Sequence, residues 1–233
     1  MKDRCIVSCC FSESNGAYYA KYADRLEQSL DQYCPGVDRT VWRHSWPPGS
    51  ISHRVHNYAF KWFAVNEAIR QGYRYVMWLD AGCCAVAPID PLWKHVEENG
   101  SAILLGADIL GTWISDKVLE YFKVDREKSM GMRLAGGCLV GLDMENRTSR
   151  RFFDWWGELA KTTNFFAGSN NRAAKIDGVM RSVQTSDADG SINSLDPRVK
   201  GHRSDEACFS LMMDKLGMEG FTLGDWHAIM KTY

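Results

Sequence analysis

A run of five apolar residues, Tyr75 to Leu79, follows directly after a helical pattern that ends at Gly72. Because the run shows no apolar/polar alternation, it predicts a strand that is buried on both faces. A helix that leads into such a strand is typical of a parallel sheet covered by helices. The chain is therefore predicted to belong to the α/β class, with a mostly parallel central sheet flanked by helices.

The same alternation of short apolar runs and helical patterns continues along the chain. Residues 166–202 interrupt it, since they are rich in Gly, Ser, Asn and Asp, and they predict a long excursion over the surface. Strands are predicted at 5–10, 40–43, 75–79, 102–105 and 138–142, and helices at 17–33, 52–72, 90–100, 116–122, 148–162 and 204–216.

Length and composition favour one soluble domain that covers residues 1–233. The 233 residues, 45% of them hydrophobic, can bury one substantial core. No run approaches the roughly 18 apolar residues of a membrane span, and the first ten residues lack a signal-peptide pattern. The eight cysteines lie mostly in apolar runs, with no Cys-x-x-Cys pair, so free thiols and a cytoplasmic location are expected.

The formal net charge of −1 is unevenly distributed. Residues 147–203 carry ten Lys/Arg against six Asp/Glu, which gives +4, so the flanking segments sum to −5. This mildly basic segment is compatible with a phosphate-rich partner, but it falls short of a nucleic-acid footprint.

Asp80 is the first candidate functional residue, because it follows the buried strand at its carboxyl end. Open α/β sheets bind their ligands at that edge. Ala81 and Gly82 come next, so the alternative is that Asp80 only caps a turn.

The stretch from Lys61-Trp62 through Gly72 to Met77-Trp78-Leu79-Asp80-Ala81-Gly82 resembles the GT-A glycosyltransferases. In that family a helix ending in glycine leads to an apolar strand and a metal-binding Asp-x-Asp. The resemblance implies a GT-A fold, donor binding at Asp80 and Gly82, and a Mn²⁺ or Mg²⁺ ion on Asp80. Glycine at position 82 replaces the second aspartate, so another ligand is needed. His227, in Gly224-Asp225-Trp226-His227, resembles such a ligand, although it is equally compatible with a surface or packing role.

Two further segments resemble the family. Ala135-Gly136-Gly137-Cys138-Leu139-Val140 is similar to its glycine-bearing strand on the acceptor side, although two glycines also suit a bulge. His202-Arg203-Ser204-Asp205-Glu206 is similar to its His-x-x-Asp-Gln segment, with Glu in place of Gln. The resemblance places Gly136, Gly137 and His202 on the acceptor side and makes Asp205 or Glu206 the base of an inverting reaction. The alternative for Asp205 is that it only complements the helix dipole.

Other candidates depend on spacing and fold analogy. Arg54, Asn57 and Lys61 are three and four residues apart, so they form either a helical stripe that holds the donor diphosphate or a solvated face. By analogy of fold, Phe11 and Glu13 would receive the base and ribose of the donor. Trp113, together with Trp226, is a candidate for stacking on a sugar ring.

These features together favour transfer of a hexose from a UDP-sugar to an acceptor hydroxyl. The acceptor is a glycan, a small molecule or a hydroxymethylated base in DNA, the last as in compact phage-type enzymes that act in the host cytoplasm. A non-catalytic carbohydrate-binding module and a nucleotidyltransferase are the alternatives, although no glycine-rich phosphate loop with a lysine follows the first strand. A Rossmann dehydrogenase is disfavoured, because Gly-x-Gly-x-x-Gly is absent after Cys10.

Overall fold

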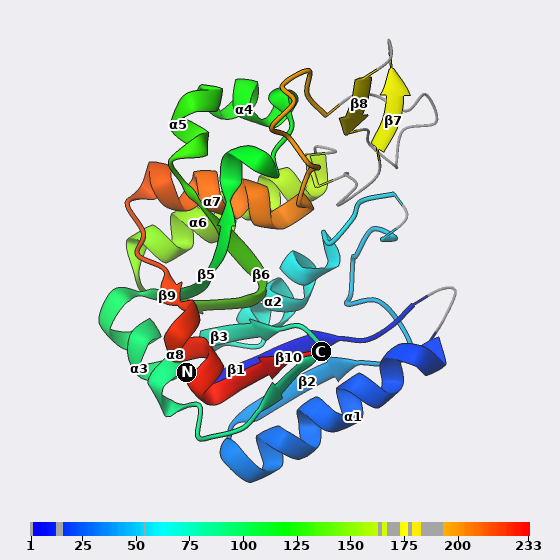
Figure 1. The fold of residues 1–233 in the computed structure, drawn as a ribbon. Coiled ribbons are helices and arrows are strands. Elements are labelled where there is room, and N and C mark those ends of the chain that lie inside the picture. The colour runs from blue at the N-terminus through cyan, green and yellow to red at the C-terminus, as the bar shows by residue number, and fades with distance from the viewer. Residues whose placement is uncertain are drawn as a thin grey trace.

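A computed structural model describes residues 2–12, 16–53, 55–162, 165–166, 173–176, 179–182 and 193–233. Its centre is a six-stranded sheet with the strand order β2-β1-β3-β6-β5-β9 (Figure 1). The strands are β1 (Lys2–Cys9), β2 (Asp38–Trp42), β3 (Tyr73–Leu79), β5 (Ser101–Ile109), β6 (Arg133–Asp143) and β9 (Phe221–Thr222).

The sheet is mostly parallel, which confirms the predicted α/β class. Strand β1 runs parallel to β2 and β3, and β5 runs parallel to β9. Strand β6 runs antiparallel to both of its neighbours, β3 and β5. The carboxyl end of β3 therefore lies beside the middle of β6, and Leu79 is in register with Leu139.

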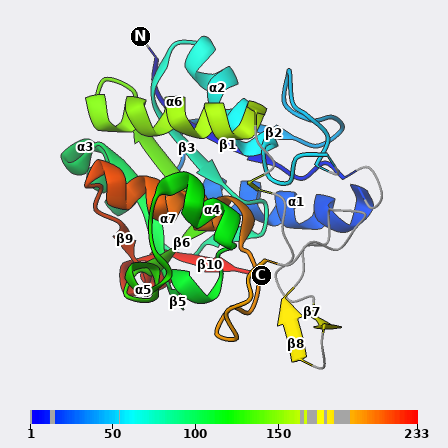
Figure 2. The ribbon, with the colours of Figure 1, turned by 90° about the horizontal axis from the view of Figure 1, so that it is seen from above.

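Helices cover both faces of the sheet (Figures 1 and 2). In β3, Val76 and Trp78 belong to one hydrophobic cluster, whereas Met77 and Leu79 belong to the other. This alternation explains why the whole run is apolar. The first cluster includes side chains of α2 (Phe60–Arg70), α6 (Arg147–Thr162) and α7 (Ser204–Leu216), and the second includes side chains of α1 (Gly16–Tyr33), α3 (Asp90–Asn99) and α8 (Leu223–Ile229).

Smaller elements surround this core. A two-stranded ribbon joins β4 (Cys83–Ala85) to β10 (Met230–Thr232) in antiparallel register, and it directly follows the Asp80 loop. The remaining elements are η1 (Leu110–Thr112), α4 (Asp116–Phe122), α5 (Arg126–Met130), β7 (Ala173–Ile176) and β8 (Val179–Ser182). All eight cysteines are free thiols. In the part of the chain that the structure describes, no helix is long and apolar enough to span a membrane.

Helix α2 begins at Phe60, eight residues later than the sequence pattern predicts. The Ser52 carbonyl accepts hydrogen bonds from the N–H groups of Val55 and His56, which makes only a turn. Tyr58 then takes a positive φ of 59°, which a right-handed helix excludes. The expected helix from Ser52 is therefore wrong in its first two turns.

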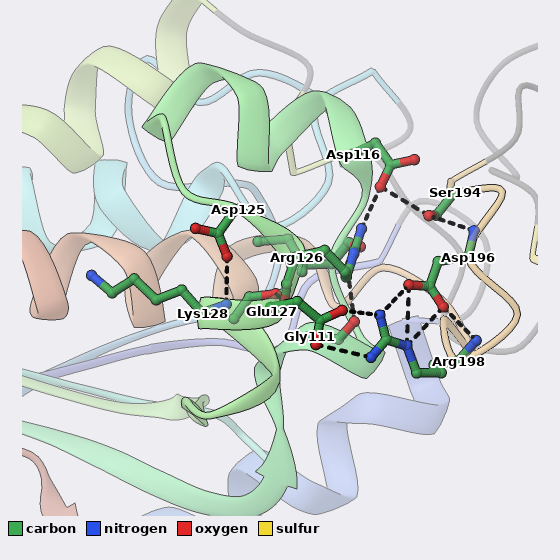
Figure 3. A network of polar contacts seen from close by, with 11 residues as sticks. Gly111, Asp116, Asp125, Arg126, Glu127, Lys128, Ser194, Asp196 and Arg198 are labelled. Carbon is green, nitrogen blue, oxygen red and sulfur yellow. Dashed lines mark hydrogen bonds and ion pairs between the residues drawn. The ribbon is translucent and has the colours of Figure 1, made fainter.

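A network of polar contacts fixes residues 194–198 on α4 and α5 (Figure 3). The Arg198 guanidinium bonds to the carboxylates of Glu127 and Asp196, and Ser194 Oγ donates to Asp116 Oδ1 at 2.8 Å. Exposed ion pairs of this kind contribute little each, but together they set the path of the segment that leads into α7.

Candidate active site

Two cavities meet at the carboxyl end of β3. The smaller has a volume of about 110 Å³ and the larger about 350 Å³. Tyr58, Lys61 and Asp80 line both of them. Residues 203–206, at the start of α7, complete the smaller cavity. The structure thus brings the Asp80 segment and the Asp205 segment, which are far apart in the sequence, to one place.

Asp80 is held in a fixed orientation at this junction. Trp78 Nε1 donates to Asp80 Oδ1 at 2.8 Å, and Lys61 Nζ lies 3.2 Å from the same oxygen. The Asp80 N–H donates to the carbonyl of Cys138 in β6 at 3.0 Å. Because the Asp80 side chain is still 36% exposed, its carboxylate is positioned by the protein and remains accessible to a ligand.

Lys61 is the buried centre of the site. Its ammonium donates to the Gly137 carbonyl at 2.9 Å and lies 3.0 Å from Asp205 Oδ2. Burial alone would lower the pKa of Lys61, but the negative charges of Asp205 and Asp80 outweigh it and raise the pKa above its usual value. Lys61 is therefore a protonated bridge between the two carboxylates.

The polar stripe expected on one helix is not formed. Lys61 points into the protein, and its side chain is only 3% exposed. Asn57 lies in the turn before α2, because Tyr58 interrupts the helix, and Arg54 lies outside the described residues. Among the described residues, Asn57 lines neither cavity.

Asp205 and Glu206 occupy the first turn of α7, as the sequence predicts. Asp205 is 2% exposed, and this burial raises its pKa although Lys61 opposes the change. Glu206 Oε1 accepts a hydrogen bond from the Gly137 N–H at 3.2 Å. Burial, together with the charge of Asp205, raises the pKa of Glu206 to about 7. A carboxyl group that exchanges its proton near neutral pH meets one requirement for a general base.

The lack of a side chain at Gly137 makes room for this arrangement. A Cβ at this position would lie 2.9 Å from Asp205 Oδ2 and 3.0 Å from Lys61 Nζ. The neighbouring Gly136 instead faces the side chain of Leu104, outside the polar cluster. Of the two glycines predicted on the acceptor side, Gly137 therefore lies at the site and Gly136 faces the core.

Backbone strain marks the smaller cavity. Apart from Lys123 at the end of α4, the described non-glycine residues with positive φ are Tyr58 at 59° and Ser204 at 41°. Both line this cavity. Such conformations cost free energy and tend to occur at functional sites.

His202 and Trp113 are buried outside the two cavities. His202 is fully buried, where its Nδ1 accepts from the Ser115 N–H at 3.4 Å and its Nε2 donates to the Phe165 carbonyl at 2.6 Å. Burial lowers the pKa of His202 to about 4, so the ring is neutral at pH 7. Trp113 is buried under the Arg203 guanidinium, 4.6 Å from the ring centroid. Neither residue is among the described residues that line the two cavities.

The expected donor residues are only partly brought together. Gly82 lines the larger cavity next to Asp80. Phe11 packs edge-on against Trp46, with ring centroids 5.1 Å apart, and is not among the described residues lining either cavity. Glu13 lies outside the described residues.

Whether a divalent cation fits this site depends on the carboxylates present. His227 is exposed on α8, Trp226 is buried in the core, and neither is among the described residues that line the two cavities. The described residues hold no group of three His, Cys, Asp or Glu side chains suited to a metal. The contacts described for Asp80 fall on Oδ1, which leaves Oδ2 as a candidate ligand. This arrangement suits Mg²⁺ that arrives with a diphosphate, since that ion commonly takes one or two carboxylates, phosphate oxygens and water.

Sequence reasoning missed the aromatic lining of the larger cavity. Tyr19 and Tyr22 of α1 contribute to it, as does Tyr233, which follows β10. Two tyrosines three residues apart lie on one face of a helix, so this pair was a readable signal. The contribution of Tyr233 depends on the β4–β10 pairing, which the sequence pattern does not indicate.

No protein-family model and no curated protein sequence matches this chain. Solved structures similar to it include a glycosyltransferase involved in the glycosylation of the major capsid of PBCV-1, with 14% identity, 68% of each chain covered and a TM-score of 0.41. Mouse xyloside xylosyltransferase 1 shows 11% identity over 95% of this chain and 85% of its own, with a TM-score of 0.46. The bifunctional glycosyltransferase WbbM shows 10% identity over 95% of this chain and 38% of its own, with a TM-score of 0.48. These values describe a partial likeness of fold.

Proposed function

We propose that this chain is a sugar-nucleotide-dependent glycosyltransferase that moves a hexose, from a UDP-sugar, to an acceptor hydroxyl. The observation that carries the proposal is the cluster in which Lys61 joins Asp80 to Asp205 at the meeting point of two cavities. A binding module needs a shaped surface, but it does not need two carboxylates held by a buried cation beside a third whose pKa is about 7.

The larger cavity is assigned to the nucleoside diphosphate. Half of its described lining residues are aromatic, and Asp80 lies where it joins the smaller cavity. Asp80 Oδ2 would hold a Mg²⁺ or Mn²⁺ ion carried by the diphosphate, and that ion would neutralise the charge of the leaving group. His227 is not needed in this assignment.

The smaller cavity is assigned to the transferred sugar and the attacking hydroxyl. Asp205, which lines this cavity, offers its carboxylate to the hydroxyls of the sugar. In an inverting reaction Glu206 takes the proton of the acceptor hydroxyl while the new bond to the anomeric carbon forms and the bond to the diphosphate oxygen breaks. A retaining reaction would need no protein base.

The acceptor is proposed to be a glycan, a small molecule or a hydroxymethylated base in DNA. The basic segment 147–203 is compatible with DNA, in which case the base would have to be flipped out of the duplex. Adding each class of acceptor to an active donor mixture distinguishes them.

The test is incubation of the protein with a panel of sugar nucleotides, with and without Mg²⁺ or Mn²⁺, and measurement of nucleoside diphosphate release. Release that depends on one donor supports the proposal. Sugar binding without release from any donor would favour a carbohydrate-binding module, and release of pyrophosphate from a nucleoside triphosphate would favour a nucleotidyltransferase.

A further inference from the structure

Aromatic rings surround the larger cavity on several sides. Tyr19 and Tyr22 come from α1, Tyr233 follows β10, and the buried rings of Phe60 and Trp78 belong to α2 and β3. Among the described lining residues, Asp80 and Lys61 are the charged ones, and they pair with each other. A cavity of this kind suits a flat, uncharged ring, because aromatic faces stack on one another.

Tyr233 is held in place by Arg25. The centre of the Arg25 guanidinium lies 3.7 Å from the centroid of the Tyr233 ring, and its Nη2 donates to the Gly82 carbonyl at 3.3 Å. The Tyr233 N–H donates to the same carbonyl at 3.1 Å. Arg25 also lies 5.2 Å from the centroid of the Tyr22 ring, so it joins the α1 side of the cavity to the β10 side.

Gly82 permits this contact. A Cβ at position 82 would lie 3.0 Å from the Tyr233 carbonyl oxygen, closer than most side chains tolerate. Gly82 stands where an Asp-x-Asp motif would carry its second aspartate. It therefore allows the segment after β10 to pass close to the Asp80 loop.

One face of the Tyr233 ring is covered by Arg25, yet the residue is 63% exposed and lines the cavity. We infer that Tyr233 stacks on the nucleobase of the donor and that Arg25 is the residue that positions it. This inference rests on the proposed function and assigns the base to the α1–β10 side of the cavity, in place of Phe11 and Glu13.

The first experiment measures binding of UDP, with GDP as the purine probe, by isothermal titration calorimetry in the presence of Mg²⁺. The nucleotide that binds wild type more tightly is then tested with Tyr233→Ala, Tyr233→Phe and Lys231→Ala. Tyr233→Ala should raise Kd about 10-fold, in line with the usual loss of one stacking ring, and Tyr233→Phe should stay within about 2-fold. Lys231 is the matched control, since it lies exposed on β10, two residues before Tyr233, and does not line the described cavity.

The role of Arg25 is tested by a double-mutant cycle with Arg25→Ala, Tyr233→Ala and the combined variant. If Arg25 acts through Tyr233, the combined variant should bind the nucleotide no more weakly than Tyr233→Ala. In turnover, Arg25→Ala should raise the donor KM more than it lowers kcat. Thermal unfolding of each variant identifies a loss of fold.

A Kd for Tyr233→Ala within about 2-fold of wild type would overturn the assignment of the base while leaving the proposed function intact. Fully additive effects in the cycle would overturn the positioning role of Arg25. Failure of wild type to bind either nucleotide would contradict the proposed function itself.

Discussion

Lys61 Nζ lies 3.0 Å from Asp205 Oδ2, and the two side chains are 3% and 2% exposed. An ion pair this deeply buried is a poor source of net stability, because the cost of removing both charges from water offsets their attraction. Its position between Asp80 and the Gly137 carbonyl indicates instead that it fixes the geometry of the site.

Replacement of Lys61 by methionine should destabilise the protein by about 3–5 kcal/mol at pH 7, because it leaves the Asp205 carboxylate buried without a counter-charge. Urea unfolding measures the change. Lys94→Met is the matched control, since Lys94 is 73% exposed in a surface pair and should change stability by less than about 0.5 kcal/mol. Adding Asp205→Asn to Lys61→Met should recover part of the loss, and a loss below 1 kcal/mol for Lys61→Met alone would contradict the buried pair.

Glu206 should make stability depend on pH in a direction opposite to that of an ordinary surface carboxylate. Its pKa rises from 4.5 to about 7 on folding. Its contribution to the free energy of unfolding is therefore fully present below about pH 4.5 and is lost as pH rises through 7. Between pH 4.5 and 8, the free energy of unfolding of wild type should therefore fall by roughly 2–3 kcal/mol relative to that of Glu206→Gln. Parallel pH profiles of unfolding free energy for the two proteins would refute the shifted pKa, and an unchanged rate of transfer in Glu206→Gln would refute its role as base.

The two adjacent glycines of β6 should respond differently to alanine. Gly137→Ala places a Cβ 2.9 Å from Asp205 Oδ2, which displaces the carboxylates and should lower the transfer rate about 100-fold or more. Gly136→Ala meets the Leu104 side chain at 3.0 Å, so it should affect the melting temperature more than the rate. Comparison of kcat and Tm for the two variants tests this division, and equal rates would mean that Gly137 has no special place in the site.

His202 should weaken the protein at low pH. Because burial lowers its pKa from 6.5 to about 4, its contribution is present above pH 6.5 and is lost as pH falls toward 4. Between pH 7 and pH 5, this residue should lower the free energy of unfolding of wild type by about 1–2 kcal/mol. His202→Gln should not show that decrease. His227→Gln, altered at an exposed histidine, serves as the control, and an identical pH dependence in all three proteins would argue against a buried neutral His202.

Most of the secondary structure was predictable, because apolar periodicity determines which surfaces must be buried. The predicted helix over 204–216 coincides with α7, and the predicted helices that end at Tyr33 and Phe122 end where α1 and α4 do. The direction of β6 was not predictable, since a strand buried on both faces has the same pattern in parallel and antiparallel pairing. The late start of α2 depends on the positive φ of Tyr58, for which tyrosine gives no local signal.

The candidate site was predictable in its parts but not in its connections. Asp80, Asp205, Glu206 and Gly137 were all expected near a ligand, and they lie together. Lys61 was assigned to a diphosphate, but its helix turns it into the protein, where it pairs with both aspartates. Tyr233 could not be found from local pattern, because its place in the cavity depends on a strand pairing between residues almost 150 positions apart.

The most direct test of the proposed function compares nucleoside diphosphate release by wild type, Asp80→Asn and Asp154→Asn with the donor that wild type prefers. Asp154 is exposed on α6 and controls for the loss of one negative charge. We expect metal-dependent release by wild type and Asp154→Asn and a decrease of about 100-fold or more in Asp80→Asn, because an uncharged amide is a much weaker ligand for the cation that balances the leaving group. Release by Asp80→Asn at the wild-type rate, or no release by wild type from any sugar nucleotide, would contradict the account.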